Sequence, residues 1–407
     1  VIQGKLFNME PAELFDNKTP NDHSDDRYIK SRTGRPAAIA ARLVSDLNQP
    51  PLLEVDPITT VANWKLRAPG DYGLTNELRD MPNSTILDGA LIRLINGGEA
   101  LNAGVRLRSL KYTFWGQNDG SPERSHMQVP YTINPVECTE QKFKARAAGW
   151  NGDAFDFGAD GEFPFTPTGC ESLPFDAEQT VKPFGPGDEE YQAGDSTEFQ
   201  AGQPTGVTVE LTMPGPDTGP QQSMVSKATV LMPEGIALSA GVGSGDANLS
   251  DCTDAQFGYL PGKNPAFSDK APTCPTGSKI GTVSFDSPLV GRLDGTVYLG
   301  TPTKEAKLRS LIIVSKPEKG LNIKLLGKTV PDPKTGQLTT IFDDLPRQPF
   351  TSFKLNFRSG LRSVLKAPDT CGDSTATGTL EAFNGKKLQV PSTIKTTGCQ
   401  PHWWTGC

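Results

Sequence analysis

Histidine, the usual general base of hydrolases, occurs only at His23, His126 and His402. A catalytic histidine needs a nearby nucleophile and a third group that orients its ring. None of the three histidines lies in a nucleophile motif, and the sequence contains no Gly-x-Ser-x-Gly turn. It also contains no phosphate loop and no dinucleotide fingerprint. The sequence therefore predicts no catalytic residue and no cofactor, and we expect the protein not to be an enzyme.

Closely spaced oxygen ligands in a glycine-rich stretch are the best candidates for a metal site. Asn151, Asp153, Asp156, Asp160 and Glu162 supply such oxygens, which suit calcium. Their spacing departs from the EF-hand loop, however, and Asp-Gly pairs also mark ordinary turns. We therefore predict no metal, with Asp153, Asp156 and Asp160 as weak calcium candidates.

The seven cysteines indicate structure rather than reaction. No Cys-x-x-Cys pair occurs, so the spacing does not favour zinc. Six cysteines can pair locally in chain order, and we expect the disulfides Cys138–Cys170, Cys252–Cys274 and Cys371–Cys399. Structural disulfides indicate an exported protein, and the alternative is a cytosolic protein with reduced, buried cysteines. Cys407 is left over, either free or joined to another chain or module, and with Trp403 and Trp404 it marks a possible junction.

A repeated pattern supports this pairing among the fifteen that six cysteines allow. Each copy has a Ser-apolar-Lys-x-x-Phe segment, then Pro-x-x-Cys, then about thirty residues to Thr-Gly-Cys. The copies occupy residues 109–114, 134–138 and 168–170, and residues 352–357, 367–371 and 397–399. The first and third cysteine pairs thus hold equivalent positions, and the chain is modular.

Length, composition and charge limit the class of protein. A chain of 407 residues predicts two or three domains. Its 42 glycines and 35 prolines favour many short strands joined by turns. A formal net charge of −7 argues against nucleic-acid binding, which needs a basic surface. No run of eighteen apolar residues exists, so we expect no membrane span in this chain.

Strand signals dominate the sequence. Apolar and polar residues alternate, with glycine, proline or aspartate turns between the runs. These runs cover residues 206–213, 227–233, 279–285, 295–300, 308–314, 321–325 and 337–342. The only helix candidates are the alanine-rich stretch 36–47 and a single turn at 253–257. The sequence predicts an all-β protein of tandem, immunoglobulin-like β-sandwich modules joined by short linkers.

The predicted modules are residues 1–172 (module A) and 173–400 (module B), followed by a junction segment at 401–407. Upstream of the cysteine repeat, residues 4–9 and 37–44 resemble residues 295–300 and 308–314. This overlay predicts that module A lacks its upstream part and that the polypeptide extends beyond Val1. It also makes the polar, charged stretch 16–35 an insertion in module A.

Module B contains a series of motifs at residues 252–257, 274–283, 293–300, 331–338, 344–350, 368–372 and 399. In these motifs it resembles a family of large secreted repeat proteins of actinobacteria. The resemblance covers 175–400 well and 50–175 more loosely. It implies an exported, multi-module β protein at the cell surface, and it implies no catalytic residues.

We therefore expect a secreted structural subunit of an extracellular surface assembly or fibre, associating through module ends or edge strands. Its partners would be copies of itself and other cell-surface components. The alternative is a cell-surface adhesin or ligand-binding module for glycan or protein.

Overall fold

The computed structural model forms two compact units. One comprises Val1–Ala68, Tyr72–Thr132 and Lys316–Leu321, and the other Pro69–Asp71, Ile133–Ser315 and Asn322–Cys407. The structure describes residues 2–9, 12–15, 27–30, 37–45, 50–56, 58–67, 73–78, 84–104, 134–149, 151–157, 161–185, 198–215, 222–239, 249–263, 266–288, 291–316 and 321–399. The module boundary predicted at 172/173 stays a prediction.

The first unit is built on a four-stranded antiparallel sheet in the order β1-β4-β6-β7. Its strands are β1 (Ile2–Met9), β4 (Ala37–Ser45), β6 (Ile58–Leu66) and β7 (Leu74–Leu78). Two further strands, β2 (Ala12–Phe15) and β3 (Arg27–Lys30), pair with each other. Thr60, Val61 and Ala62 of β6 are buried, which places the core of this unit along the central strands.

A small subdomain emerges from one end of this sheet. It consists of β5 (Glu54–Val55), β8 (Ser84–Asp88), α1 (Ala90–Ile95) and β9 (Leu101–Gly104), with strand order β5-β8-β9. The segment between β4 and β6 and the segment that follows β7 leave the antiparallel sheet at the same end. The two segments therefore meet there. Gly89, at φ 103°, allows α1 to start against the chain at Leu52, because a Cβ there would lie 2.7 Å from the Leu52 carbonyl oxygen.

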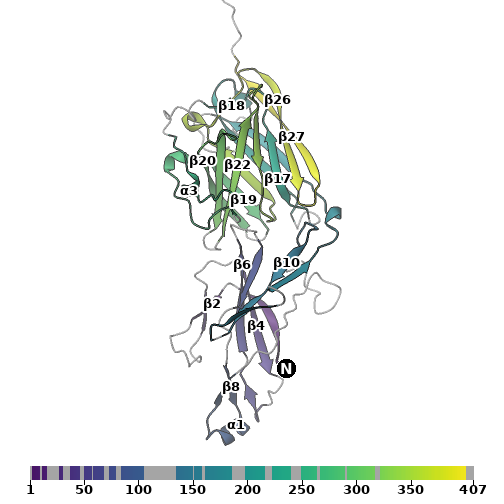
Figure 1. The fold of residues 1–407 in the computed structure, drawn as a ribbon, viewed down its shortest axis with the longest axis vertical. Coiled ribbons are helices and arrows are strands. Elements are labelled where there is room, and N and C mark those ends of the chain that lie inside the picture. Colours follow the sequence, from purple (N-terminus) through teal and green to yellow (C-terminus); the bar gives the residue numbers. More distant parts are fainter. Residues whose placement is uncertain are drawn as a thin grey trace, which may run out of the picture. The chain divides into compact units, whose positions relative to one another are not determined.

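The second unit contains one large sheet (Figure 1). Among the described residues its order is β15-β27-β26-β17-β23-β22-β21-β20-β19-β24-β16-β25-β18, with β14 also on β16. The strands are β14 (Glu178–Phe184), β15 (Glu198–Gln200), β16 (Pro204–Thr212), β17 (Val225–Leu231), β18 (Ala237–Leu238), β19 (Lys279–Ser287), β20 (Gly291–Gly300), β21 (Leu308–Lys316), β22 (Leu321–Pro331), β23 (Leu338–Phe342), β24 (Ser352–Phe357), β25 (Leu365–Lys366), β26 (Gly372–Ala382) and β27 (Lys387–Thr397). The short helical elements are η3 (Cys170–Ser172), α3 (Asp254–Phe257), η4 (Thr276–Ser278) and η6 (Gly360–Arg362).

The large sheet curls until its two ends meet. β14 lies against β27, where the Ser392 hydroxyl donates to the Gln179 carbonyl oxygen at 3.0 Å. Alternation in the strands turns one face inward: Val390, Ser392 and Ile394 of β27 are buried, whereas Pro391 and Thr393 are exposed. The enclosed core is therefore apolar, and Phe184 and Phe199 are almost completely buried.

A separate two-stranded ribbon, called the arm below, also belongs to the second unit. It consists of β10 (Gln141–Lys144) paired with β13 (Glu162–Phe165) and β11 (Arg146–Ala148) paired with β12 (Ala154–Asp156), both antiparallel. The base of the arm is closed by the Cys138–Cys170 disulfide. An ion pair of 2.7 Å from Arg347 to Glu137 fastens the same base to the loop after β23.

The structure confirms an all-β protein. It corrects one sequence prediction: residues 36–47 were expected to favour a helix, but Ala37–Ser45 is the strand β4. Hydrogen bonding to β1 and β6 on both sides outweighs the helix propensity of its alanines. The polar stretch 16–35 contributes the strand β3. The single turn predicted at 253–257 is α3, whose Thr253 cap accepts the Gln256 N–H.

Candidate functional site

Three disulfides join Cys138 to Cys170, Cys252 to Cys274 and Cys371 to Cys399, the same pairs that the sequence predicts. The first and third have matching local structures. In each, the second cysteine follows a glycine with positive φ, Gly169 at 81° and Gly398 at 75°. In each, its backbone N–H donates to the sulfur of the first cysteine, at 3.1 Å and 3.0 Å. The Thr-Gly-Cys repeat therefore encodes a repeated structure.

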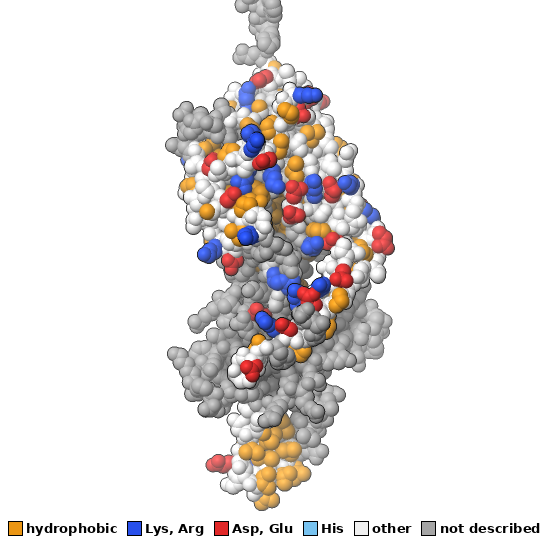
Figure 2. Space-filling view, in the orientation of Figure 1, with side chains coloured by type: hydrophobic (Ala, Val, Ile, Leu, Met, Phe, Trp, Pro, Cys, Tyr) orange, Lys and Arg blue, Asp and Glu red, His pale blue; other side chains and the backbone are white. Residues whose placement is uncertain are grey.

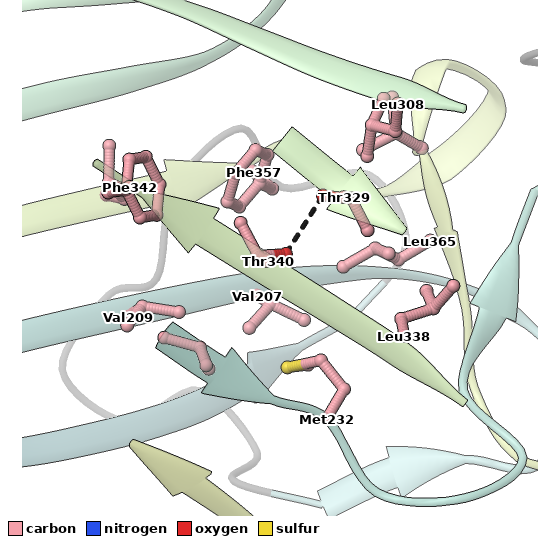
Figure 3. Close-up of a pocket in the computed structure, with 13 residues that line it drawn as sticks. Val207, Val209, Met232, Leu308, Thr329, Leu338, Thr340, Phe342, Phe357 and Leu365 are labelled. Atoms are coloured by element: carbon pink, nitrogen blue, oxygen red, sulfur yellow. Dashed lines mark hydrogen bonds between the residues drawn. The ribbon is translucent and has the colours of Figure 1, made fainter. Parts of the chain in front are cut away.

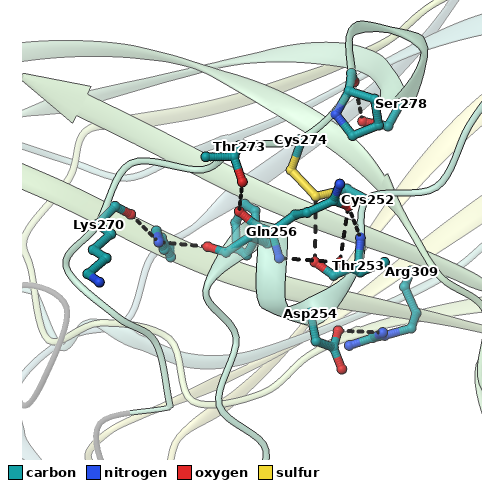
Figure 4. Close-up of a disulfide and its surroundings, with 12 residues drawn as sticks. Cys252, Thr253, Asp254, Gln256, Lys270, Thr273, Cys274, Ser278 and Arg309 are labelled. Carbon is teal, nitrogen blue, oxygen red and sulfur yellow. Dashed lines mark hydrogen bonds and ion pairs between the residues drawn. A yellow bond between two sulfur atoms is a disulfide. The ribbon is translucent and has the colours of Figure 1, made fainter.

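The second disulfide pins a loop onto the outer side of the sheet (Figure 4). Cys252, Phe257, Leu311 and Ile313 form a buried apolar cluster, against which Tyr259 and other ring side chains pack. The α3 turn inside this loop is held by the capping box of Thr253 and Gln256. The loop is thus a small core of its own, built from local signals.

Two buried cations fix this loop. Lys324 is 1% exposed, and its ammonium donates to the carbonyl oxygens of Phe257 and Lys270, each at 2.7 Å. Burial lowers the pKa of Lys324 from its ordinary value. Arg309 is 4% exposed and lies 2.8 Å from a carboxylate oxygen of Asp254. Both cations link the loop to strands β21 and β22, which is a structural role.

A cavity of about 50 Å³ lies inside the curled sheet (Figure 3). Its lining is aliphatic and aromatic, apart from Thr329 and Thr340, whose hydroxyls hydrogen bond to each other at 2.9 Å. None of the described residues that line the cavity is charged, and its two hydroxyls bond to each other. It therefore lacks the convergent polar groups that orient a ligand in a binding pocket, and we assign it no role in binding.

The subdomain of the first unit carries an exposed aliphatic cluster, the apolar tip (Figure 2). Its members are Leu52 (53% exposed), Leu91 (43%), Leu94 (80%), Ile95 (68%) and Leu101 (38%). Only Ile92 of helix α1 is buried, so the helix turns most of its apolar side chains to the surface. Contiguous exposed apolar clusters of this kind commonly mark interaction sites.

The charges near the apolar tip are mostly negative. Residues 50–56 and 84–104 contain four carboxylates and one arginine. Arg93 donates to Asp88 through Nε at 2.7 Å and Nη2 at 2.8 Å, which lowers the pKa of Asp88. The tip therefore suits an apolar partner without a strong negative charge.

The arm exposes aromatic side chains on one face. Phe143 is 65% and Phe163 is 45% exposed, and they are direct cross-strand partners. Phe165 stacks on Phe143 with ring centroids 4.7 Å apart. On the opposite face Lys142 and Lys144 both lie 2.7 Å from Glu162 and lower its pKa to about 2.

The weak calcium candidates make protein contacts instead. Asp153 accepts a hydrogen bond from Asn151, and Asp156 pairs with Arg146 at 3.1 Å. Within the described ranges no group of three His, Cys, Asp or Glu side chains is placed to hold a metal ion. Asp160 lies outside the described residues, as do the three histidines, Trp403, Trp404 and Cys407.

The comparisons with known proteins add no identity. No family model matches the chain, and neither the curated proteins nor the solved structures contain a match. None of the helices in the part of the chain that the structure describes is long and apolar enough to cross a membrane.

Sequence reasoning missed the apolar tip, the aromatic face of the arm and the buried Lys324. The sequence does contain a signal for the tip, since residues 91–95 are mostly apolar and do not alternate with polar residues as in a strand. The sequence contains no signal for the burial of Lys324, because a lysine in an alternating strand is expected to face outward.

Proposed function

We propose that this protein is a structural subunit of an extracellular surface assembly, made of tandem immunoglobulin-like β-sandwich modules. The observation that carries the proposal is the disulfide-closed hairpin built twice, once as β26–β27 in the core and once as the exposed arm. Because the aromatic face of the arm is exposed, the arm is suited to packing against another module. The pairing of six cysteines is compatible with an oxidising, extracellular compartment.

Further support comes from the four-stranded sheet of the first unit. Its order β1-β4-β6-β7 repeats the order β20-β21-β22-β23 of the second unit. The registers agree as well: Gly4 pairs with Leu43 as Gly295 pairs with Val314. The proposal therefore extends the resemblance to actinobacterial surface repeat proteins to both halves of the chain, and it assigns no catalytic residue and no cofactor.

Association is tested by sedimentation velocity over a wide protein range, with negative-stain electron microscopy of the same samples. We expect oligomers or filaments that grow with concentration, because a contact between two different surfaces that does not close by rotation gives an open assembly. Intact mass under reducing and non-reducing conditions would show whether Cys407 joins subunits. A particle that stays monomeric at every concentration would contradict the proposal.

A second candidate function, adhesion, is favoured by the apolar tip. Leu94 and Ile95 stand 80% and 68% exposed, with an acidic surround. The test is binding of the protein to intact bacterial cells, comparing Leu94→Asp with the matched control Leu74→Asp, which is 50% exposed on the same unit. Loss of binding in Leu94→Asp alone would support adhesion, and equal binding by both variants and the parent would oppose it.

A further inference from the structure

The arm and the β26–β27 hairpin pair their strands at matching distances from their cysteines. Gln141, three residues after Cys138, pairs with Phe165, five residues before Cys170. Ser374, three residues after Cys371, pairs with Ile394, five residues before Cys399. The β10–β13 ladder therefore has the same register relative to its disulfide as the β26–β27 ladder, and positions can be equated as far as Lys144 and Glu162. Beyond these residues the β11–β12 ladder is shifted by four residues on the returning strand.

The equated positions differ in burial. Phe143 corresponds to Ala376, which is 0% exposed, and Phe165 corresponds to Ile394, which is 1% exposed. Phe163 corresponds to Ser392, which is 8% exposed. The aromatic face of the arm is thus the face that the second hairpin turns into the core, here left at the surface.

The equated edges also differ. In the second hairpin, residues 377–382 of β26 pair with β17, with Leu231 opposite Thr377 and Thr229 opposite Thr379. Counted along the first strand of each hairpin, the corresponding residues of the arm are 144–149. Among the described residues no strand lies on that side of β10 or β11, whose sheets contain two strands each.

The charges of the arm indicate which kind of strand could pair with residues 144–149. Lys144 and Arg146 correspond to Thr377 and Thr379 of β26. In the β26–β17 pair these two threonines lie opposite Leu231 and Thr229. In a strand added to the arm, the residues equivalent to Leu231 and Thr229 would therefore lie opposite Lys144 and Arg146. Strands β10 to β13 carry three cations and two carboxylates. A strand with carboxylates at these two positions would be complementary in charge.

The edges of the large sheet are less suited to strand addition. β14 carries Pro183, β27 carries Pro391, and β15 covers β27 from Lys395 to Thr397. Proline removes a ladder donor. Strands β10 and β11 contain no proline.

We propose that the arm is a strand acceptor: residues 144–149 pair antiparallel with an extended strand of another polypeptide, apolar on the face toward Phe143 and acidic on the other. This places the arm in the mode of recognition in which main-chain hydrogen bonds give affinity and alternate side chains give specificity. The inference rests on the proposed assembly function for its biological role, but its binding chemistry is tested separately.

The test uses the intact protein and a fluorescent peptide with the sequence of residues 224–232, changed at two positions by Thr229→Glu and Leu231→Glu. Anisotropy should show saturable binding, and hydrogen exchange at residues 144–149 should slow when the peptide is bound. A peptide with an additional Lys227→Pro change should not bind, because it loses a ladder donor. At the end of β17 the N–H of Met232 points to Leu338 of β23, so by alternation the N–H groups of residues 227, 229 and 231 point to the other side, toward β26. The peptide with the original Thr229 and Leu231 should bind more weakly.

The protein variants sharpen the test. Phe143→Asp should raise the Kd by at least about tenfold, since it removes an apolar contact and places a charge on the docking face. Leu260→Asp, at a site 41% exposed outside the arm, should leave the Kd within about twofold. Equal binding of the proline peptide, or unchanged exchange at 144–149, would overturn the inference. Filaments that form while the peptide neither binds nor competes would overturn it and leave the assembly function standing.

Discussion

The arm and the β26–β27 hairpin share the same local sequence pattern but lie in different environments. Both have a Thr-Gly-Cys closure, a glycine of positive φ and an N–H donated to the disulfide sulfur. In the β26–β27 hairpin the face that consists of Ala376, Ser392 and Ile394 is buried. In the arm the same face carries Phe143 and Phe163, which are exposed, and the half-buried Phe165. Local sequence therefore sets the hairpin and its register, while the neighbouring strands decide whether its apolar face becomes core.

The largest expected effect separates the two disulfides. Replacing Cys371 and Cys399 by serine should lower the free energy of unfolding of the second unit by about 3–4 kcal/mol, because its loop of 28 residues gains freedom in the unfolded chain. Replacing Cys138 and Cys170 should instead expose the arm to limited proteolysis with little change in the main transition. Urea unfolding and timed proteolysis check both results, and equal losses in the main transition would remove the distinction.

Equivalent side chains of the two hairpins should respond differently to truncation. Ile394→Ala should cost about 2–4 kcal/mol in the free energy of unfolding, since it leaves a cavity in the core. Phe165→Ala at the equated position of the arm should cost under about 1 kcal/mol, because no core surrounds it. Chemical denaturation of the two variants side by side is the measurement. A larger cost for Phe165→Ala would mean that the arm is already packed in solution.

Buried and exposed lysines offer a smaller contrast. Lys324→Met should lower the free energy of unfolding by about 2–3 kcal/mol, since the carbonyl oxygens of Phe257 and Lys270 lose their buried donor. Lys142→Met, on the surface of the arm, should leave the unfolding midpoint unchanged. Thermal and urea unfolding of both variants measure the difference, and an unchanged midpoint for Lys324→Met would show that water replaces the ammonium.

The smallest effect is a pH dependence confined to the arm. Hydrogen bonds from Lys142 and Lys144 lower the pKa of Glu162 from 4.5 to about 2. The stabilising effect of Glu162 is complete above pH 4.5 and is lost as pH falls toward 2, because the folded arm holds the charged form. Amide exchange in the arm, corrected for the intrinsic pH dependence, should become less protected over that range. Glu162→Gln should abolish this change.

Much of the fold could be predicted from alternation and turn residues. The runs 206–213 and 337–342 correspond to strands β16 and β23, as their alternation and flanking turn residues indicate. The alanines of residues 36–47 favour a helix, but strand pairing on both sides of Ala37–Ser45 outweighs that propensity. Helix α1 was missed because its apolar residues face the surface, where no core-facing stripe forms.

The candidate surfaces were harder to foresee than the disulfides. The repeat of Pro-x-x-Cys and Thr-Gly-Cys was enough to propose the cysteine pairs. Nothing in the local sequence says that Phe143 lies at the surface, since an alternating Phe reads as inward. Its exposure depends on which strands are present beside the arm, and that is a property of tertiary structure.

Hydrogen exchange at residues 144–149, measured as a function of protein concentration, tests the central claim most directly. We expect fast exchange in dilute solution, as for a two-stranded ribbon, and slower exchange as copies assemble and the arm acquires a paired strand. Phe143→Asp should keep exchange fast at every concentration. Exchange that is equally fast, or equally slow, across the whole range in the parent protein would contradict the account.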